Sequence, residues 1–340
     1  MMAESMSGLT GQMQAPANGA QAALAPPASP ADPAGEPRTN RPVGPVQDCD
    51  RAGAFRRGQS PSCMSQRSVL ITGCSSGIGL DAARTLSARG WRVFAACRKS
   101  EDVEARRAEG LDSVLIDHAD ARSVDEGAQA VLDATDGSLD ALFNNGAYGI
   151  PGRVEDLPRE ALDAILQANL LGPHQLTRAV IPAMRRAGRG RLINCSSVLG
   201  FAALRYRGAY NSTKFAMEGL TDTLRLELSH TPLHVVLIQP GPIATRIREN
   251  SIPHFERWID VPASAERDVY ERELMPRLYE PSQKKDRFEL PPSAVTDALI
   301  HALESDRPKA RYRITTPTRV AAMLKRLLPT RLLDRVLLNS

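Results

Sequence analysis

Ser68-Val69-Leu70-Ile71-Thr72-Gly73-Cys74-Ser75-Ser76-Gly77-Ile78-Gly79 places a glycine-rich turn directly after a short apolar run. An amphipathic pattern follows, so the stretch predicts a buried strand, a tight turn and the start of a helix. Unpaired N–H groups and the helix dipole favour a phosphate at a helix N-terminus, and glycines let the main chain approach a pyrophosphate closely. The stretch therefore predicts a dinucleotide site. Its residues are Gly73, Ser75, Ser76, Gly77, Ile78 and Gly79.

The spacing of these glycines, T-G-x-x-x-G-I-G, differs from the common dinucleotide pattern G-x-G-x-x-G. A glycine cluster by itself also marks ordinary loops, so a purely structural turn is the alternative. The context favours the cofactor site, because Val69, Leu70 and Ile71 form a strand pattern before the turn and apolar residues recur at helical spacing after it.

Beyond the turn, short apolar runs alternate with helical patterns such as Ser123–Ala134, Arg159–Arg186 and Ala209–Leu228. This alternation predicts an α/β fold, a Rossmann-like doubly wound parallel sheet of seven strands with helices on both faces. Ligands bind such sheets at the carboxyl ends of the strands. The expected strands are Ser68–Ile71, Arg92–Ala96, Ser113–Ile116, Ala141–Phe143, Arg191–Asn194, Val235–Ile238 and Tyr312–Ile314.

The chain has 340 residues and a net charge of +4, and its composition limits the classes of protein to which it can belong. Residues 1–65 are rich in Ala and Pro and poor in large apolar side chains, which predicts a disordered extension, or translation that starts at Met64. The sequence has no signal-peptide core and no apolar run long enough to span a membrane. Five scattered cysteines favour a reducing, cytoplasmic setting, and neither they nor the six histidines predict a metal site. The small positive charge does not indicate nucleic-acid binding.

One domain is therefore expected over residues 66–316. Its segment 246–290 interrupts the strand–helix alternation with charges, prolines and aromatic residues. Long insertions in compact domains are usually functional loops, so the segment is interpreted as a substrate lid; a surface excursion is the alternative.

Charged and polar residues follow the early strands. Arg98 and Lys99 stand where an NAD site usually carries an acid and an NADP site a cation, so they favour NADP(H). A pair of cations that merely solvates a loop is the alternative. Asp117 and Asn144, after the third and fourth strands, are expected along the cofactor cleft, although such residues also form turns.

The strongest catalytic pattern is Tyr210-Asn211-Ser212-Thr213-Lys214. The four-residue spacing puts Tyr210 and Lys214 on one face of a helix, where an ammonium is expected to lower the pKa of the tyrosine. Ser197 follows a strand, and its hydroxyl could bind a substrate carbonyl oxygen. Asn169, in a helical segment, is expected to complete a proton relay.

Together these motifs resemble the short-chain dehydrogenase/reductase family over about four-fifths of the chain, from Ser68 onward. The resemblance implies that Asn169, Ser197, Tyr210 and Lys214 are catalytic. It also implies that the segment beside the nicotinamide includes Pro240, Gly241, Ile243 and Thr245. One motif departs from the family: Asn-Asn-Ala-Gly is replaced by Asn144-Asn145-Gly146-Ala147, which exchanges the residue that takes a positive φ freely.

The resemblance implies NADPH-dependent reduction of hydrophobic aldehydes or ketones to alcohols by a homodimer or homotetramer. Bacterial NADP-dependent aldehyde reductases and retinol or 17β-hydroxysteroid dehydrogenases are the most similar subgroups, so an alcohol-oxidising dehydrogenase is the alternative. An NADP-binding regulatory or membrane-peripheral protein is the alternative outside enzymes. The implied substrate is a small carbonyl compound or alcohol.

Residues 317–340 form a further segment with apolar side chains at helical spacing and interleaved cations. They predict an amphipathic basic helix. Such a helix can lie on an anionic membrane surface, or it can cap the substrate pocket or form a subunit interface.

Overall fold

The structure is a computed structural model that describes residues 66–279 and 288–338. The expected extension over residues 1–65 and the lid residues 280–287 lie outside the described residues. The described chain contains no helix long and apolar enough to cross a membrane.

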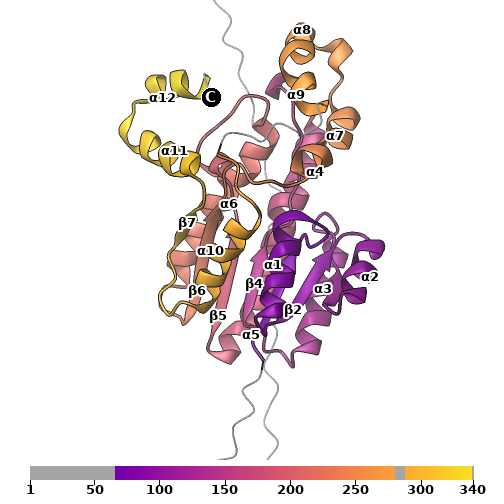
Figure 1. Ribbon diagram of the computed structural model, residues 1–340, viewed down its shortest axis with the longest axis vertical. Helices are drawn as coiled ribbons and strands as arrows, with labels where there is room; N and C mark the ends of the chain where they lie inside the picture. The colour runs from indigo at the N-terminus through magenta and orange to yellow at the C-terminus, as the bar shows by residue number, and fades with distance from the viewer. Residues whose placement is uncertain (1–65, 280–287, 339–340) are drawn as a thin grey trace, which may run out of the picture. The chain divides into compact units, whose positions relative to one another are not determined.

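A parallel sheet of seven strands forms the centre of the fold, in the order β3-β2-β1-β4-β5-β6-β7 (Figure 1). This confirms the predicted doubly wound fold, and each expected strand is present within about two residues of its predicted bounds. The strands are β1 Ser68–Thr72, β2 Arg92–Cys97, β3 Asp112–Leu115, β4 Ala141–Asn144, β5 Gly190–Cys195, β6 Leu233–Gln239 and β7 Arg311–Arg313.

Helices cover both faces of the sheet, which explains why the central strands are continuous apolar runs. In β1, Val69 and Ile71 belong to one core cluster with residues of α1 and α10, whereas Leu70 belongs to a second cluster with residues of α3 and α5. Figure 1 shows α1 and α10 on one face of the sheet. The helices on the sheet are α1 Gly77–Ala88, α2 Ser100–Ala108, α3 Ala121–Ala134, α5 Gly172–Ala187, α6 Gly208–Glu227 and α10 Ser293–Glu304.

A third core cluster lies beyond the carboxyl ends of the strands. It joins segment 246–290, the expected lid, to the segment after β4, with Ile150, Phe255, Tyr270 and Leu274 buried in it. The described part of the lid is therefore packed against the domain, as the burial of these side chains shows. Its helices, above the sheet in Figure 1, are α7 Ile247–Trp258, α8 Arg267–Val269 and α9 Met275–Tyr279, and they lie near α4 Arg159–Leu166.

The C-terminal segment differs from the single helix expected over residues 317–340. It forms two helices, α11 Thr316–Leu327 and α12 Thr330–Leu338. Pro329 lies between them, and Leu328 has an extended backbone with φ −95° and ψ 138°. Proline has no N–H for the helix and disfavours helical geometry in the preceding residue, so the amphipathic pattern continues across a bend.

Candidate active site

The strand order reverses between β1 and β4, which creates the crevice where dinucleotides bind in this class of fold. The glycine turn lies beside it. Gly73 has φ +75° and Gly77 has φ +57°, conformations that side chains disfavour. A Cβ on Gly73 would lie 2.7 Å from the Cα of Gly146, after β4, so the two chain segments meet without room for a side chain.

The helix that follows the turn leaves its first N–H groups available. Ser76, at its N-cap, makes no side-chain capping bond, and the first turn of α1 has no acidic residue. Thr245 is close to this turn, because a Cβ on Gly77 would lie 3.2 Å from the Cγ2 of Thr245. The predicted phosphate site and the segment after β6 are therefore adjacent.

Hydrogen bonds of Thr72 join the end of β1 to the segment after β4 beside the crevice. The Thr72 hydroxyl accepts hydrogen bonds from the backbone N–H groups of Asn145 and Gly146, each at 3.0 Å, and the Asn145 amide donates to the Thr72 carbonyl at 3.0 Å. In the exchanged pair, neither Gly146 nor Ala147 has a positive φ, so neither position requires a glycine for its backbone conformation.

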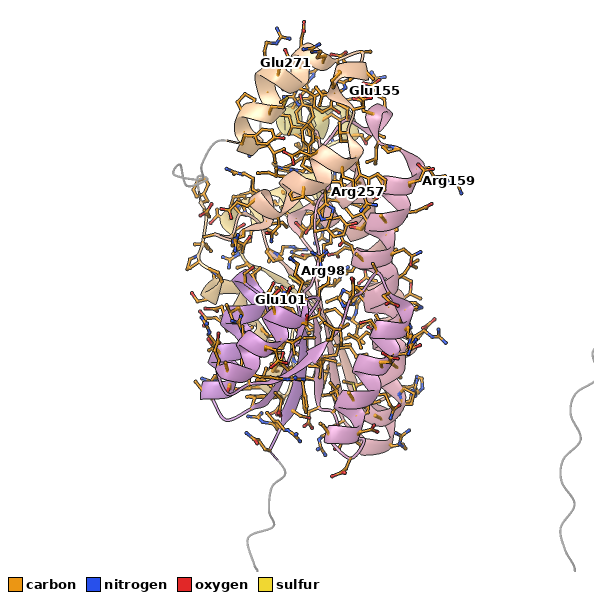
Figure 2. The ribbon with its side chains drawn as sticks, turned by 90° about the vertical axis from the view of Figure 1, so that its right-hand side faces the viewer. Arg98, Glu101, Glu155, Arg159, Arg257 and Glu271 are labelled. Carbon is orange, nitrogen blue, oxygen red and sulfur yellow. The ribbon has the colours of Figure 1, made fainter. Side chains whose placement is uncertain are left out.

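The polar residues expected along the cofactor cleft occupy different environments. Arg98 and Lys99 are exposed after β2, and among the described residues no carboxylate forms an ion pair with either. Figure 2 shows Arg98 at the end of the sheet, below Arg257 of α7. Asp117 accepts a hydrogen bond from the N–H of Ala119, as a turn residue does. The Asn144 amide points inward, donating to Thr177, the Pro173 carbonyl and Asn194.

The remaining residues of Pro240-Gly241-Pro242-Ile243-Ala244-Thr245 tie β6 to later parts of the chain. A Cβ on Gly241 would lie 2.6 Å from the Thr318 hydroxyl, at the start of α11. Ile243 forms an isolated bridge with Leu290, and the N–H of Ala244 donates to the Leu290 carbonyl at 2.9 Å.

Ser197, Tyr210 and Lys214 lie together where β5 ends and α6 begins. The Ser197 hydroxyl oxygen accepts the Leu199 N–H at 3.1 Å, which leaves its own proton free to donate. Tyr210 retains some exposed surface, but burial around its hydroxyl raises the pKa of the phenol, and the nearby Cys195 adds to this effect. The hydrogen bond between Tyr210 and Ser197 opposes the rise in pKa.

The expectation that Lys214 lowers the pKa of Tyr210 is not met in this structure. Lys214 is only 2% exposed, and its ammonium donates to the Cys195 carbonyl at 2.7 Å. The Nζ atom lies 5.5 Å from the centroid of the Tyr210 ring. Burial lowers the pKa of Lys214, whereas nearby Cys195 and Glu218 oppose that shift.

Asn169 is fully buried, in a π-helical turn over Gln167–Leu171 between α4 and α5. Its side chain pairs with the backbone of Tyr148 in both directions, accepting from the N–H at 3.1 Å and donating to the carbonyl at 2.8 Å. It also donates to the Thr213 hydroxyl at 3.4 Å, one residue before Lys214. Asn169 thus connects the segment after β4 with α6.

A family model described as short chain dehydrogenase matches residues 67–255. The chain belongs to this family. It is 41% identical over 273 residues to the uncharacterized oxidoreductase YbbO of Escherichia coli K12, covering 80% of this chain and 94% of that protein. Human retinol dehydrogenase 16 is 32% identical over 293 residues, covering 83% and 91%. A solved short-chain dehydrogenase/reductase from Burkholderia phymatum has the same fold, with a TM-score of 0.63, 23% identity and coverage of 77% and 92%.

The chain is thus an oxidoreductase of the short-chain dehydrogenase family, and the sequence did not indicate one contact that its segment 246–290 makes. Tyr148 stacks on His254 of α7, with ring centroids 3.9 Å apart and an angle of 17° between the rings. Burial lowers the pKa of His254, and Arg98 and Arg257 lower it further. The position of Tyr148, just after the fourth strand, was the available signal. Nothing in the local pattern indicated its partner.

Proposed function

We propose that this short-chain dehydrogenase reduces hydrophobic aldehydes or ketones to alcohols with NADPH. The observation that carries the proposal is the meeting of Ser197, Tyr210 and Lys214 at the carboxyl edge of the same sheet that holds the glycine turn. The Ser197 hydroxyl has a proton to donate, and the Tyr210 hydroxyl is hydrogen-bonded to it. One carbonyl oxygen could accept from both groups.

The residues of the crevice fit a dinucleotide. The turn excludes side chains at Gly73 and Gly79, and the start of α1 offers uncapped N–H groups, as a pyrophosphate requires. NADPH, when bound, supplies the hydride. Arg98 and Lys99 support selection of the 2′-phosphate, because they are exposed cations without acidic partners among the described residues. The other proposed contacts are Ser75, Ser76, Gly77, Ile78, Asp117, Asn144, Tyr210, Lys214, Pro240, Gly241, Ile243 and Thr245.

The proposed proton donor is Tyr210. Its raised pKa keeps the phenol protonated at neutral pH, which suits a donor to the developing alkoxide in the reductive direction. Ser197 orients and polarises the carbonyl. Lys214 holds the nicotinamide ribose, and Asn169 positions a water that links Lys214 to solvent. A second contribution of Lys214, stabilising the phenolate, requires its ammonium to leave the Cys195 carbonyl.

The surroundings of Tyr210 support an apolar substrate. Tyr210 borders the third core cluster, together with Tyr148, Ile252 and Trp258. The resemblance to retinol dehydrogenase 16 supports, as a second candidate, oxidation of a hydrophobic alcohol at the same residues. We further propose that the protein is a homodimer or homotetramer and that it is cytoplasmic. The free thiols at Cys74, Cys97 and Cys195 support the cytoplasmic location, because that compartment keeps thiols reduced.

The test is a turnover assay with a panel of aldehydes, ketones and alcohols, with NADPH and NADH side by side. We expect faster reduction with NADPH, and loss of turnover in Tyr210→Phe with NADPH binding retained. Arg98→Ala should weaken NADPH binding about 10- to 100-fold, the effect of losing a charged hydrogen bond, and leave NADH binding unchanged. Faster turnover with NADH would refute the cofactor assignment. Turnover retained in Tyr210→Phe would refute the catalytic one, and NADPH binding without turnover on any substrate would favour the regulatory alternative.

A further inference from the structure

The C-terminal helices present an amphipathic surface that the domain does not cover. On α11, Met323 is 53% exposed and Leu327 is 69% exposed. On α12, none of whose described residues is buried, Leu332 and Val336 are 45% and 42% exposed. Figure 1 shows α12 beyond α11, on the side away from the sheet. The domain therefore leaves these four side chains uncovered.

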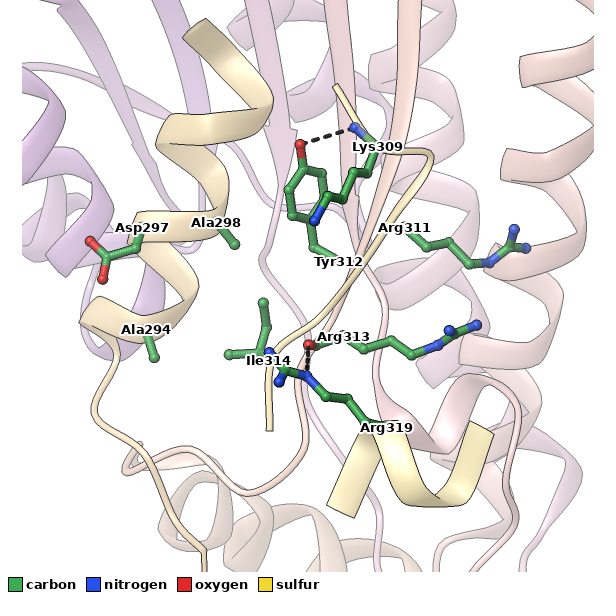
Figure 3. Close-up of a pocket in the computed structure, with 9 residues that line it drawn as sticks. All are labelled: Ala294, Asp297, Ala298, Lys309, Arg311, Tyr312, Arg313, Ile314 and Arg319. Atoms are coloured by element: carbon green, nitrogen blue, oxygen red, sulfur yellow. Dashed lines mark hydrogen bonds between the residues drawn. The ribbon is translucent and has the colours of Figure 1, made fainter. Parts of the chain in front are cut away.

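Two adjoining hollows lie beside this stripe, and Arg313 and Arg319 line both. The first, of about 670 Å³, lies between β7 and α10 and also contains Lys309 (Figure 3). The second, of about 550 Å³, runs along one face of α11, where cations alternate with apolar residues at positions 319, 322, 323, 326 and 327. A hollow lined by several cations thus continues into an amphipathic one.

Several cations of this region form no ion pair with a carboxylate among the residues that the structure describes. Arg311 pairs with Asp222 and Glu218. In contrast, no described carboxylate forms an ion pair with Lys309, Arg313 or Arg326. From residue 309 to residue 338 the chain has eight lysines and arginines and a single acid, Asp334. Asp297, from α10, is the acidic residue that lines the first hollow.

We propose that this C-terminal face, comprising Lys309, Arg313, α11 and α12, docks on the surface of an anionic phospholipid membrane. The unpaired cations match lipid phosphates, and the exposed apolar residues match the boundary of the acyl chains. The charge argues against a second copy of the chain, because a symmetric contact would bring the same cations against each other. Lys325 contributes to holding α11 on the domain, because it donates to the Phe201 carbonyl at 2.5 Å and lies over the Phe215 ring.

The test is flotation of the full chain with vesicles of phosphatidylcholine, with and without phosphatidylglycerol. We expect binding only to the anionic vesicles, weakened by salt. The double variant Arg326→Gln/Arg331→Gln should bind about 25-fold more weakly, at roughly fivefold for each cation near the surface. Met323→Glu/Leu327→Glu should abolish binding and leave the melting temperature unchanged, because both side chains are exposed. Arg185→Gln, on the exposed surface of α5, is the matched control and should bind like the wild type.

Three results would overturn the proposal. The first is the absence of binding to anionic vesicles. The second is equal binding of the wild type and both double variants. The third is a stable dimer that Met323→Glu/Leu327→Glu dissociates, which would assign the face to a second copy. All three results concern binding or association and not turnover, so they test the membrane proposal independently of the proposed reductase activity.

Discussion

His118 makes the stability of the domain depend on pH in a way that one substitution can isolate. It follows β3, and its ring lies against Gly146, where a Cβ would be 3.5 Å from the Cε1 atom. The Nε2 atom is buried without a hydrogen-bond partner among the described residues. Burial lowers the pKa of His118 from 6.5 to about 4, against the opposing effects of the Ala168 and Gly146 backbone and of Asp117.

The sign of the effect follows from linkage. Because the pKa is lower in the folded state, the unfolded chain binds the proton more readily between pH 4 and pH 6.5. The free energy of unfolding should therefore fall as the pH falls through this window, by about 1.4 kcal/mol per pH unit. Over the whole window, His118 should account for a loss of about 3 kcal/mol.

The assay is urea unfolding of the wild type and His118→Gln at a series of pH values from 7 to 4, followed by the fluorescence of buried Trp91. Glutamine does not titrate, so the difference in stability between the two proteins should shift by about 3 kcal/mol in favour of the variant as the pH falls. The exposed His230→Gln is the control and should follow the wild type. Parallel stability curves for wild type and His118→Gln would refute the reasoning.

Three further substitutions test the site and the lid. Gly73→Ala should lower the free energy of unfolding by about 2–4 kcal/mol and abolish NADPH binding, because its Cβ would meet Gly146. Gly110→Ala is the control: Gly110 has φ +83° but open space around it, so the substitution should cost only about 1–2 kcal/mol in urea unfolding. Tyr270→Phe should cost about 1–3 kcal/mol by thermal melting, because the buried hydroxyl donates to Asp156 at 2.7 Å and accepts the Arg153 N–H at 2.8 Å; an unchanged melting temperature would contradict this. His254→Ala should raise the KM for the carbonyl substrate, because α7 loses its stack on Tyr148. His254→Phe should restore the wild-type KM, since phenylalanine can stack on Tyr148 in the same way. Equal KM values for the wild type and His254→Ala in steady-state kinetics would exclude a role of this stack in substrate binding.

The sequence by itself predicted those parts of the protein that depend on neighbouring residues. Short apolar runs indicated the strands, which helices cover on both faces. The glycine turn was also indicated, and Gly73 and Gly77 in it have positive φ angles that favour glycine. The helical spacing placed Tyr210 and Lys214 on one helix, and the order of the motifs identified the family. Local geometry and side-chain periodicity depend on residues that are close together in the sequence, so these predictions succeeded.

Some predictions from the sequence were wrong because they ignored a competing contact. The helix expected over residues 317–340 bends at Pro329, where the missing N–H outweighs the amphipathic pattern. Spacing alone suggested that Lys214 would lower the pKa of Tyr210, but the ammonium binds the Cys195 carbonyl, and burial of the phenol raises that pKa. Both outcomes depend on groups that the local pattern does not contain.

Only the tertiary structure determined how distant segments meet. The stack of Tyr148 on His254 and the bonds from Asn169 to Tyr148 and Thr213 join four parts of the chain. The inward turn of the Asn144 amide and the exposure of the stripe on α11 and α12 also follow from packing. Periodicity specifies which face of an element is apolar, but the partner of that face depends on the free energy of the whole packed domain. The sequence therefore specified the elements and their chemistry, and the packing specified their partners.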